Sequence, residues 1–211
     1  MSVVNERIAV FVGMTGLGKI VLVTPLGKPL TRISPVGYSP EAELGMQLLA
    51  MNYPLIATGR VQWLAAKVNV PFESVTKPAP IQALAAIGAA VTREEANSLL
   101  AAHALVSRGE LIGPLAALRP VSRAATPPDG KKQPGPPDRS GIHVWIVEDG
   151  ILGLQATHGA IERLKPHGLD IHAHAIGIAA GGPKAEALAP LSEIVLPDVN
   201  AAIAYIEPRL L

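Results

Sequence analysis

The chain has no cysteine, which excludes disulfide bonds and metal sites built on thiolates. Aromatic residues make up only 3% of its 211 positions and charged residues 17%, against roughly 25% charged residues in typical soluble domains. Hydrophobic residues nevertheless reach 49%, so alanine and aliphatic side chains supply the apolar content. This composition excludes a disordered chain and predicts a domain that is large enough to bury a substantial core.

Long apolar runs are missing as well. A membrane-spanning helix needs about 20 continuous apolar residues, whereas Lys19 interrupts the stretch 8–23 and the run 83–91 is far shorter. The first residues lack the basic start and apolar segment of a signal peptide. We therefore expect a cytoplasmic protein with no membrane contact. A net charge of +1 without a basic stripe gives no reason to expect nucleic acid as a partner.

Apolar strand patterns and helical patterns alternate along the sequence. The expected strands cover residues 8–12, 53–57, 143–147, 171–178 and 193–196; a hairpin covers 20–33; the expected helices cover 39–52, 59–69, 81–91, a stretch opened by a capping box at 92–95, 151–165, 183–191 and a last segment capped by Asp198. This alternation predicts an α/β fold, a three-layer Rossmann-like parallel sheet with helices on both faces.

The segment 124–141 interrupts the pattern because it is rich in proline, glycine and charge and has almost nothing to bury. It is typical of an extended linker. We therefore divide the chain into a first part of the core at 1–91, a helical insertion at 92–123, this linker, and a second part of the core at 142–211. The helices at 81–91 and 96–105 are apolar nearly all round, which predicts burial in the core or in a homo-oligomer contact.

Residues 13–19 match the phosphate-loop pattern G-x-x-x-x-G-K, from Gly13 to Lys19. A working loop also needs Ser or Thr after the lysine and a helix behind it. Ile20 follows here, and the next residues have a strand pattern. A nucleotide-binding module using Gly13–Lys19 is therefore only a second alternative.

Four segments, taken in order, resemble the motifs of the haloacid-dehalogenase-like (HAD) hydrolase superfamily. Residues 8–17 (IAVFVGMTGL) resemble its first motif, 55–60 (LIATGR) the second, 77–87 (KPAPIQALAAI) the third and 144–156 (VWIVEDGILGLQA) the fourth. The resemblance covers most of the chain outside 92–141. It implies a HAD-like fold in which these segments meet at the carboxyl edge of the sheet, where open α/β sheets bind ligands.

The family's chemistry implies a role for each motif. Its first Asp forms an aspartyl-phosphate, the second Asp is a general acid/base, Thr or Ser and Lys hold the phosphoryl oxygens, and the last acid holds Mg²⁺. In this sequence Gly13 stands at the position of the nucleophile and Thr15 at that of the acid/base, and no Asp precedes Asp129. The resemblance therefore implies a member that has lost the aspartyl-phosphate route, and we predict no catalytic residue.

What the sequence retains is a candidate anion cradle and a candidate magnesium site. The cradle comprises the backbone at Gly13, Met14, Thr15 and Gly16 with the side chains of Thr58 and Lys77; the magnesium ligands are Glu148 and Asp149. Simpler alternatives are a helix cap for Thr58, a solvated loop position for Lys77 and an N-cap for Asp149.

We expect a catalytically inactive HAD-like domain that binds a small anionic ligand or a protein partner. The first alternative is a Mg²⁺-dependent phosphate-ester hydrolase with an unconventional nucleophile or a metal-activated water. His172 and His174 share one face of a strand, which makes them either a candidate metal pair or neutral, partly buried side chains.

Overall fold

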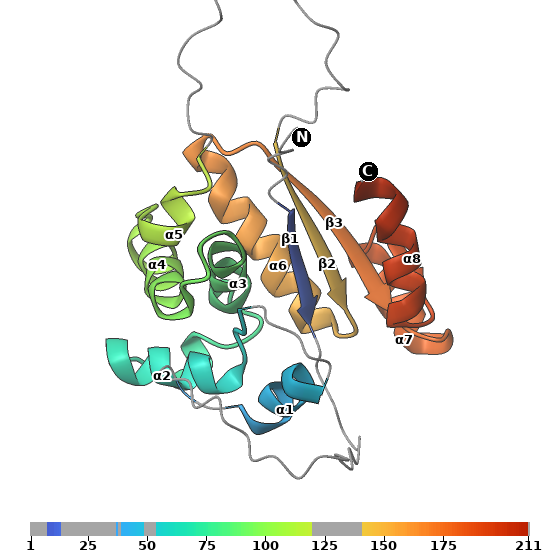
Figure 1. Cartoon of the computed structure of the whole chain (residues 1–211), viewed down its shortest axis with the longest axis horizontal. Coiled ribbons are helices and arrows are strands. Elements are labelled where there is room, and N and C mark those ends of the chain that lie inside the picture. Colours follow the sequence, from blue (N-terminus) through green and yellow to red (C-terminus); the bar gives the residue numbers. More distant parts are fainter. Residues whose placement is uncertain (1–7, 14–36, 38, 49–53, 120–140, 211) are drawn as a thin grey trace, which may run out of the picture.

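The computed structural model of the chain describes residues 8–13, 37, 39–48, 54–119 and 141–210 (Figure 1). Its elements are β1 (Ile8–Gly13), α1 (Pro40–Leu48), α2 (Thr58–Val68), η1 (Phe72–Ser74), α3 (Ile81–Thr92), α4 (Glu95–Arg108), α5 (Gly113–Ala116), β2 (Ile142–Glu148), α6 (Ile151–Leu164), η2 (Lys165–His167), β3 (Ile171–Ile178), α7 (Gly182–Leu188), η3 (Ala189–Leu191), β4 (Ile194–Leu196) and α8 (Val199–Leu210). The expected hairpin at 20–33 and nearly all of the expected linker at 124–141 lie outside the described residues.

The four strands form one parallel sheet in the order β1-β2-β3-β4. Helices α6 and α7 connect β2 to β3 and β3 to β4, as parallel neighbours require a crossover. The register pairs Gly13 of β1 with Glu148 of β2, and Glu148 with Gly177 of β3. These three residues therefore lie at one level, at the carboxyl edge of the sheet.

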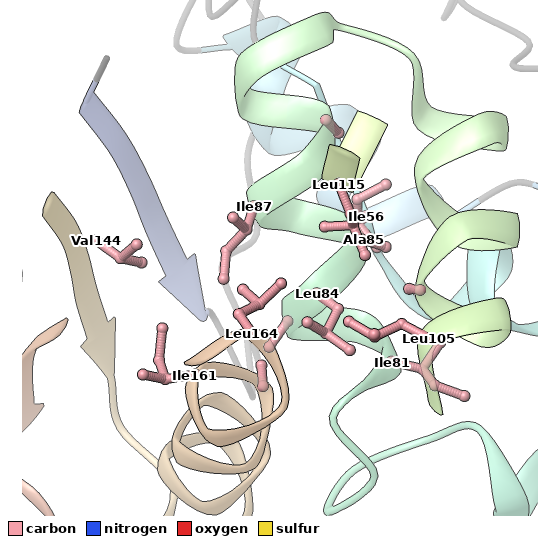
Figure 2. Packing of buried hydrophobic residues seen from close by; sticks show 14 of the residues in the cluster. Ile56, Ile81, Leu84, Ala85, Ile87, Leu105, Leu115, Val144, Ile161 and Leu164 are labelled. Carbon is pink, nitrogen blue, oxygen red and sulfur yellow. The ribbon is translucent and has the colours of Figure 1, made fainter. Parts of the chain in front are cut away.

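Helices cover both faces of this sheet (Figure 1). Because alternate strand residues point to opposite faces, Val144 and Ile146 of β2 belong to the large cluster with α3 and α6 (Figure 2), whereas Trp145 and Val147 pack with α8. The expected α/β fold with a parallel sheet between helical layers is confirmed. No helix in the described ranges is long and apolar enough to cross a membrane.

Helix α3 is the centre of the larger cluster. Its Leu84, Ala85 and Ala89 have no exposed surface, since α4, α5 and α6 all pack against it (Figure 2). Gly88 allows α4 and α5 to approach α3 closely, since a Cβ at this position would lie 3.1 Å from Ser98 Oγ and 3.2 Å from Pro114. The prediction that this apolar helix is buried on several sides is confirmed.

The expected strand at 53–57 is wrong for the four of its residues that are described. Residues 54–57 are irregular and lead directly into α2. The Leu55 N–H donates to the Glu95 carboxylate at 2.8 Å, and the Ile56 carbonyl accepts from the Gln82 side chain at 2.8 Å. Side chains of α3 and α4 thus satisfy backbone groups that a strand would use in the sheet.

The capping box at 92–95 is also wrong. The Thr92 hydroxyl donates to the Gly88 carbonyl within α3, and Glu94 is the N-cap of α4 without a side-chain bond. The Glu95 carboxylate, which would accept from a backbone N–H in a capping box, instead accepts from the Leu55 N–H and from Arg60. By contrast, the Asp198 cap is confirmed, since its Oδ1 accepts from the Ala201 N–H at 2.8 Å.

Candidate functional site

An ion pair between Lys77 and Glu148 lies at the carboxyl edge of the sheet. Lys77 precedes α3, and its Nζ donates to Oε1 of Glu148, the last residue of β2, across 71 positions of sequence. The Glu148 side chain has no exposed surface, while that of Lys77 is 14% exposed. The structure thus brings together two of the residues that the third and fourth motifs suggested.

The Glu148 carboxylate is packed against the first turn of α6. A Cβ on Gly153 would lie 1.8 Å from Glu148 Oε1, so only glycine leaves room for the carboxylate there. Oε2 accepts from the Asp149 N–H at 3.2 Å. Burial raises the pKa of the Glu148 carboxyl above its usual value, and the Lys77 ammonium partly opposes this by stabilising the ionised form.

Asp149 pairs with a lysine as well. Its Oδ2 lies 3.3 Å from Nζ of Lys184, which belongs to the first turn of α7, and the two side chains are 31% and 52% exposed. Gly150 is the N-cap of α6, so the N-cap alternative for Asp149 is wrong. Lys184 was not predicted from the sequence. Its place just after β3 was the one signal for it, because loops that follow parallel strands meet at the carboxyl edge.

The remaining residues of the predicted cradle do not all reach this edge. Gly13 does, through its register with Glu148, whereas Met14, Thr15 and Gly16 lie outside the described residues. Thr58 is exposed at the first position of α2, and among the described residues it is not part of the Lys77–Glu148 ion pair.

Thr58 does not cap its helix either. The N-cap of α2 is Ala57, which makes no side-chain cap bond. The Gly59 N–H instead donates to Ser39 Oγ at 2.8 Å, from a segment 20 residues earlier. Ser39 thus supplies the hydroxyl oxygen that a cap residue of α2 would otherwise provide.

Arg60 of α2 is a fully buried cation that was not predicted from the sequence. Its fully buried guanidinium pairs through Nη1 with Glu43 of α1 and through Nε with Glu95 of α4, at 3.1 Å for the latter. Nη1 also donates to the Gly37 carbonyl at 3.3 Å. The group joins three helices, and no local pattern in the sequence indicates it because its partners lie 17 to 35 residues away.

The histidines of β2 and β3 form a row on the α8 face of the sheet. His174 Nε2 lies 3.0 Å from His143 Nδ1, and its Nδ1 lies 3.2 Å from a Glu193 oxygen. His172 lies 3.1 Å from Asp170. Within the described residues, no group of three or more His, Cys, Asp or Glu is arranged to hold a metal ion, and the metal pair of His172 and His174 stays a prediction.

The donor set at Glu148 and Asp149 does not fit Mg²⁺. This cation takes six oxygen ligands in a near-ideal octahedron. Here one Glu148 oxygen accepts from the Lys77 ammonium and the other from a backbone N–H, while Asp149 faces Lys184. Each carboxylate already has a cation.

Comparisons of the chain with protein-family models, with curated proteins and with solved structures find no match.

Proposed function

We propose that this chain is a catalytically inactive HAD-like domain that binds a small anionic ligand at the carboxyl edge of its sheet. The observation that carries the proposal is the convergence of two lysines from separate loops, Lys77 and Lys184, on the consecutive acidic residues at the end of β2. Lysine ammonium groups bind phosphate and carboxylate as point charges. The carboxyl edge is also where open α/β sheets bind ligands.

The HAD-like assignment is supported by three of the four segments that resemble the family's motifs. The first supplies Gly13, the third Lys77 and the fourth Glu148 and Asp149, and all of them come together at this edge. The second segment does not, since the described residues that precede Thr58, 54–57, are irregular.

Loss of catalysis follows from the side chains at the same place. Gly13 has no side chain that could act as a nucleophile, although its register places it beside Glu148. Glu148 is fully buried and paired with Lys77, whereas a general base or nucleophile must reach the reacting atoms. These facts favour a binding domain over the alternative of a hydrolase with an unconventional nucleophile or a metal-activated water.

The accessible cation of the site is Lys184. An ion pair at 3.3 Å whose members are 31% and 52% exposed contributes little to stability, so an anion can compete with Asp149 for this ammonium at low cost. Lys77 has three N–H donors, of which Glu148 accepts one. Lys77 therefore adds a second, partly exposed positive group beside the first.

The binding test uses inorganic phosphate and sulfate, titrated calorimetrically into the full chain. Lys184→Met should weaken binding by about tenfold or more, the loss expected for one charge-assisted hydrogen bond. Lys165→Met is the matched control, because Lys165 is also half exposed and paired with a glutamate but lies at the far end of α6. Equal affinities of the wild type and Lys184→Met would overturn the proposal.

A second test addresses catalysis. The purified chain and its Asp149→Ala variant are assayed with Mg²⁺ on a panel of phosphomonoesters, and we expect no turnover by either. Turnover by the wild type that disappears in Asp149→Ala would show that the chain is a hydrolase.

A further inference from the structure

The Glu148 carboxylate is enclosed by protein. Its side chain has no exposed surface and fills the space that Gly153 leaves open. A buried carboxylate needs a counter-charge, because an unpaired ion in the protein interior is strongly unfavourable. The structure supplies that charge through the Nζ of Lys77.

The two carboxylates at the end of β2 and the two lysines beside them balance in charge. Lys77 pairs with Glu148 and Lys184 with Asp149. One divalent cation between the same carboxylates would supply the same two positive charges, and carboxylate oxygens are the ligands that hard divalent cations prefer. The two lysines thus supply the positive charge that a divalent metal ion would supply to these two carboxylates.

We propose that Lys77, assisted by Lys184, takes the place of a divalent cation at Glu148 and Asp149, so that the carboxyl edge is metal-independent. A corollary concerns access. Lys77 is partly exposed whereas Glu148 is not, so truncating the lysine opens the carboxylate to solvent and leaves it without its counter-charge. We therefore expect the Glu148 carboxylate of the Lys77→Ala variant to bind a divalent cation. This inference concerns the ion pairs alone and stands whether or not the edge binds an anion.

The test measures divalent-cation binding directly with Mn²⁺, followed by electron paramagnetic resonance, and thermal unfolding in EDTA and in Mg²⁺. The wild type should bind no Mn²⁺ at this edge and should unfold at the same temperature in both solutions. Lys77→Ala should bind Mn²⁺ at least tenfold more tightly than the wild type, and Mg²⁺ should raise its Tm. Adding Glu148→Gln to Lys77→Ala should abolish both effects.

Lys165→Ala is the matched control, since Lys165 also pairs with a glutamate but on the surface, where both partners are more than half exposed. It should show no response to either cation. A metal response of Lys77→Ala no larger than that of Lys165→Ala would overturn the proposal. So would Mn²⁺ binding by the wild type that Glu148→Gln abolishes. This last measurement decides the matter even if Lys77→Ala does not fold.

Discussion

Replacing Gly153 with alanine tests the position of the buried Glu148 carboxylate. In an ordinary helix interior, Gly→Ala stabilises by roughly 0.8–1.0 kcal/mol. In this chain the new Cβ would lie 1.8 Å from Oε1, 2.1 Å from Cδ and 2.7 Å from Oε2 of Glu148. The carboxylate must therefore shift. Because it is enclosed by protein, we expect the shift to break its contact with Lys77.

The size of the effect follows from that displacement. Breaking a buried ion pair by leaving one partner uncompensated costs about 3–5 kcal/mol, and the gain in helix propensity offsets roughly 1 kcal/mol of it. We therefore expect Gly153→Ala to lower the free energy of unfolding by about 2–4 kcal/mol. For a chain of this length, that corresponds to a Tm lower by roughly 4–16 °C.

Gly159→Ala in the same helix is the matched control. A Cβ there would meet only Pro80, at 3.6 and 4.0 Å, which is ordinary van der Waals contact. This variant should raise Tm by about 2–4 °C. Both variants are compared with the wild type by scanning calorimetry and urea unfolding, so that the substitution is the same in both while the neighbours of the new Cβ differ.

A rise in Tm for Gly153→Ala equal to that for Gly159→Ala would refute the placement of the carboxylate against α6. Repeating the substitution in a Glu148→Ala background separates the clash from any other effect of the extra methyl group. With the carboxylate removed, Gly153→Ala should no longer destabilise the chain.

Three further predictions concern Arg60, the titration of Glu148 and the cap of α8. Arg60→Met removes the buried guanidinium that pairs with Glu43 and Glu95, which are 2% and 9% exposed, and should lower the free energy of unfolding in urea by about 3–5 kcal/mol; a loss below about 1 kcal/mol would contradict this. Because the folded-state pKa of Glu148 is raised above the ordinary 4.5, the stability that Glu148 contributes at low pH is lost as pH rises through that pKa. The wild type should therefore lose stability relative to Glu148→Gln as urea unfolding is repeated from about pH 4 upward, and parallel curves would count against it. Asp198→Ala removes the cap of α8 and should cost roughly 1 kcal/mol by scanning calorimetry, with an unchanged Tm as the contrary result.

The fold class and most of the helices and strands could be predicted from the residues alone. The expected strand at 171–178 has the same bounds as β3, and the expected helices at 81–91 and 151–165 differ from α3 and α6 by one residue at the carboxyl end. Such segments are predictable because the spacing of apolar residues within a segment indicates whether it forms a buried strand or a buried helix face. The order of strands and helices then leaves a parallel sheet as the consistent arrangement.

Part of the candidate site was also predictable. Lys77, Glu148 and Asp149 were named from motifs at expected strand ends, and the parallel sheet does bring them to one edge. That prediction works because the carboxyl ends of parallel strands share an edge whatever the details of the packing. Lys184 belongs to the same edge but has no motif around it.

How these charges are paired could not be predicted from the sequence, because it depends on the packing of distant segments. The sequence suggested Mg²⁺ for Glu148 and Asp149, whereas the fold gives them Lys77, from 71 positions away, and Lys184, from 35 positions away. The same holds for Glu95, whose carboxylate bonds Leu55 and Arg60 instead of capping α4. The physical reason is that local patterns report which side chains can be buried and which groups can bond their neighbours in sequence. The partner of a buried charge is set by which distant segment the packing brings within reach.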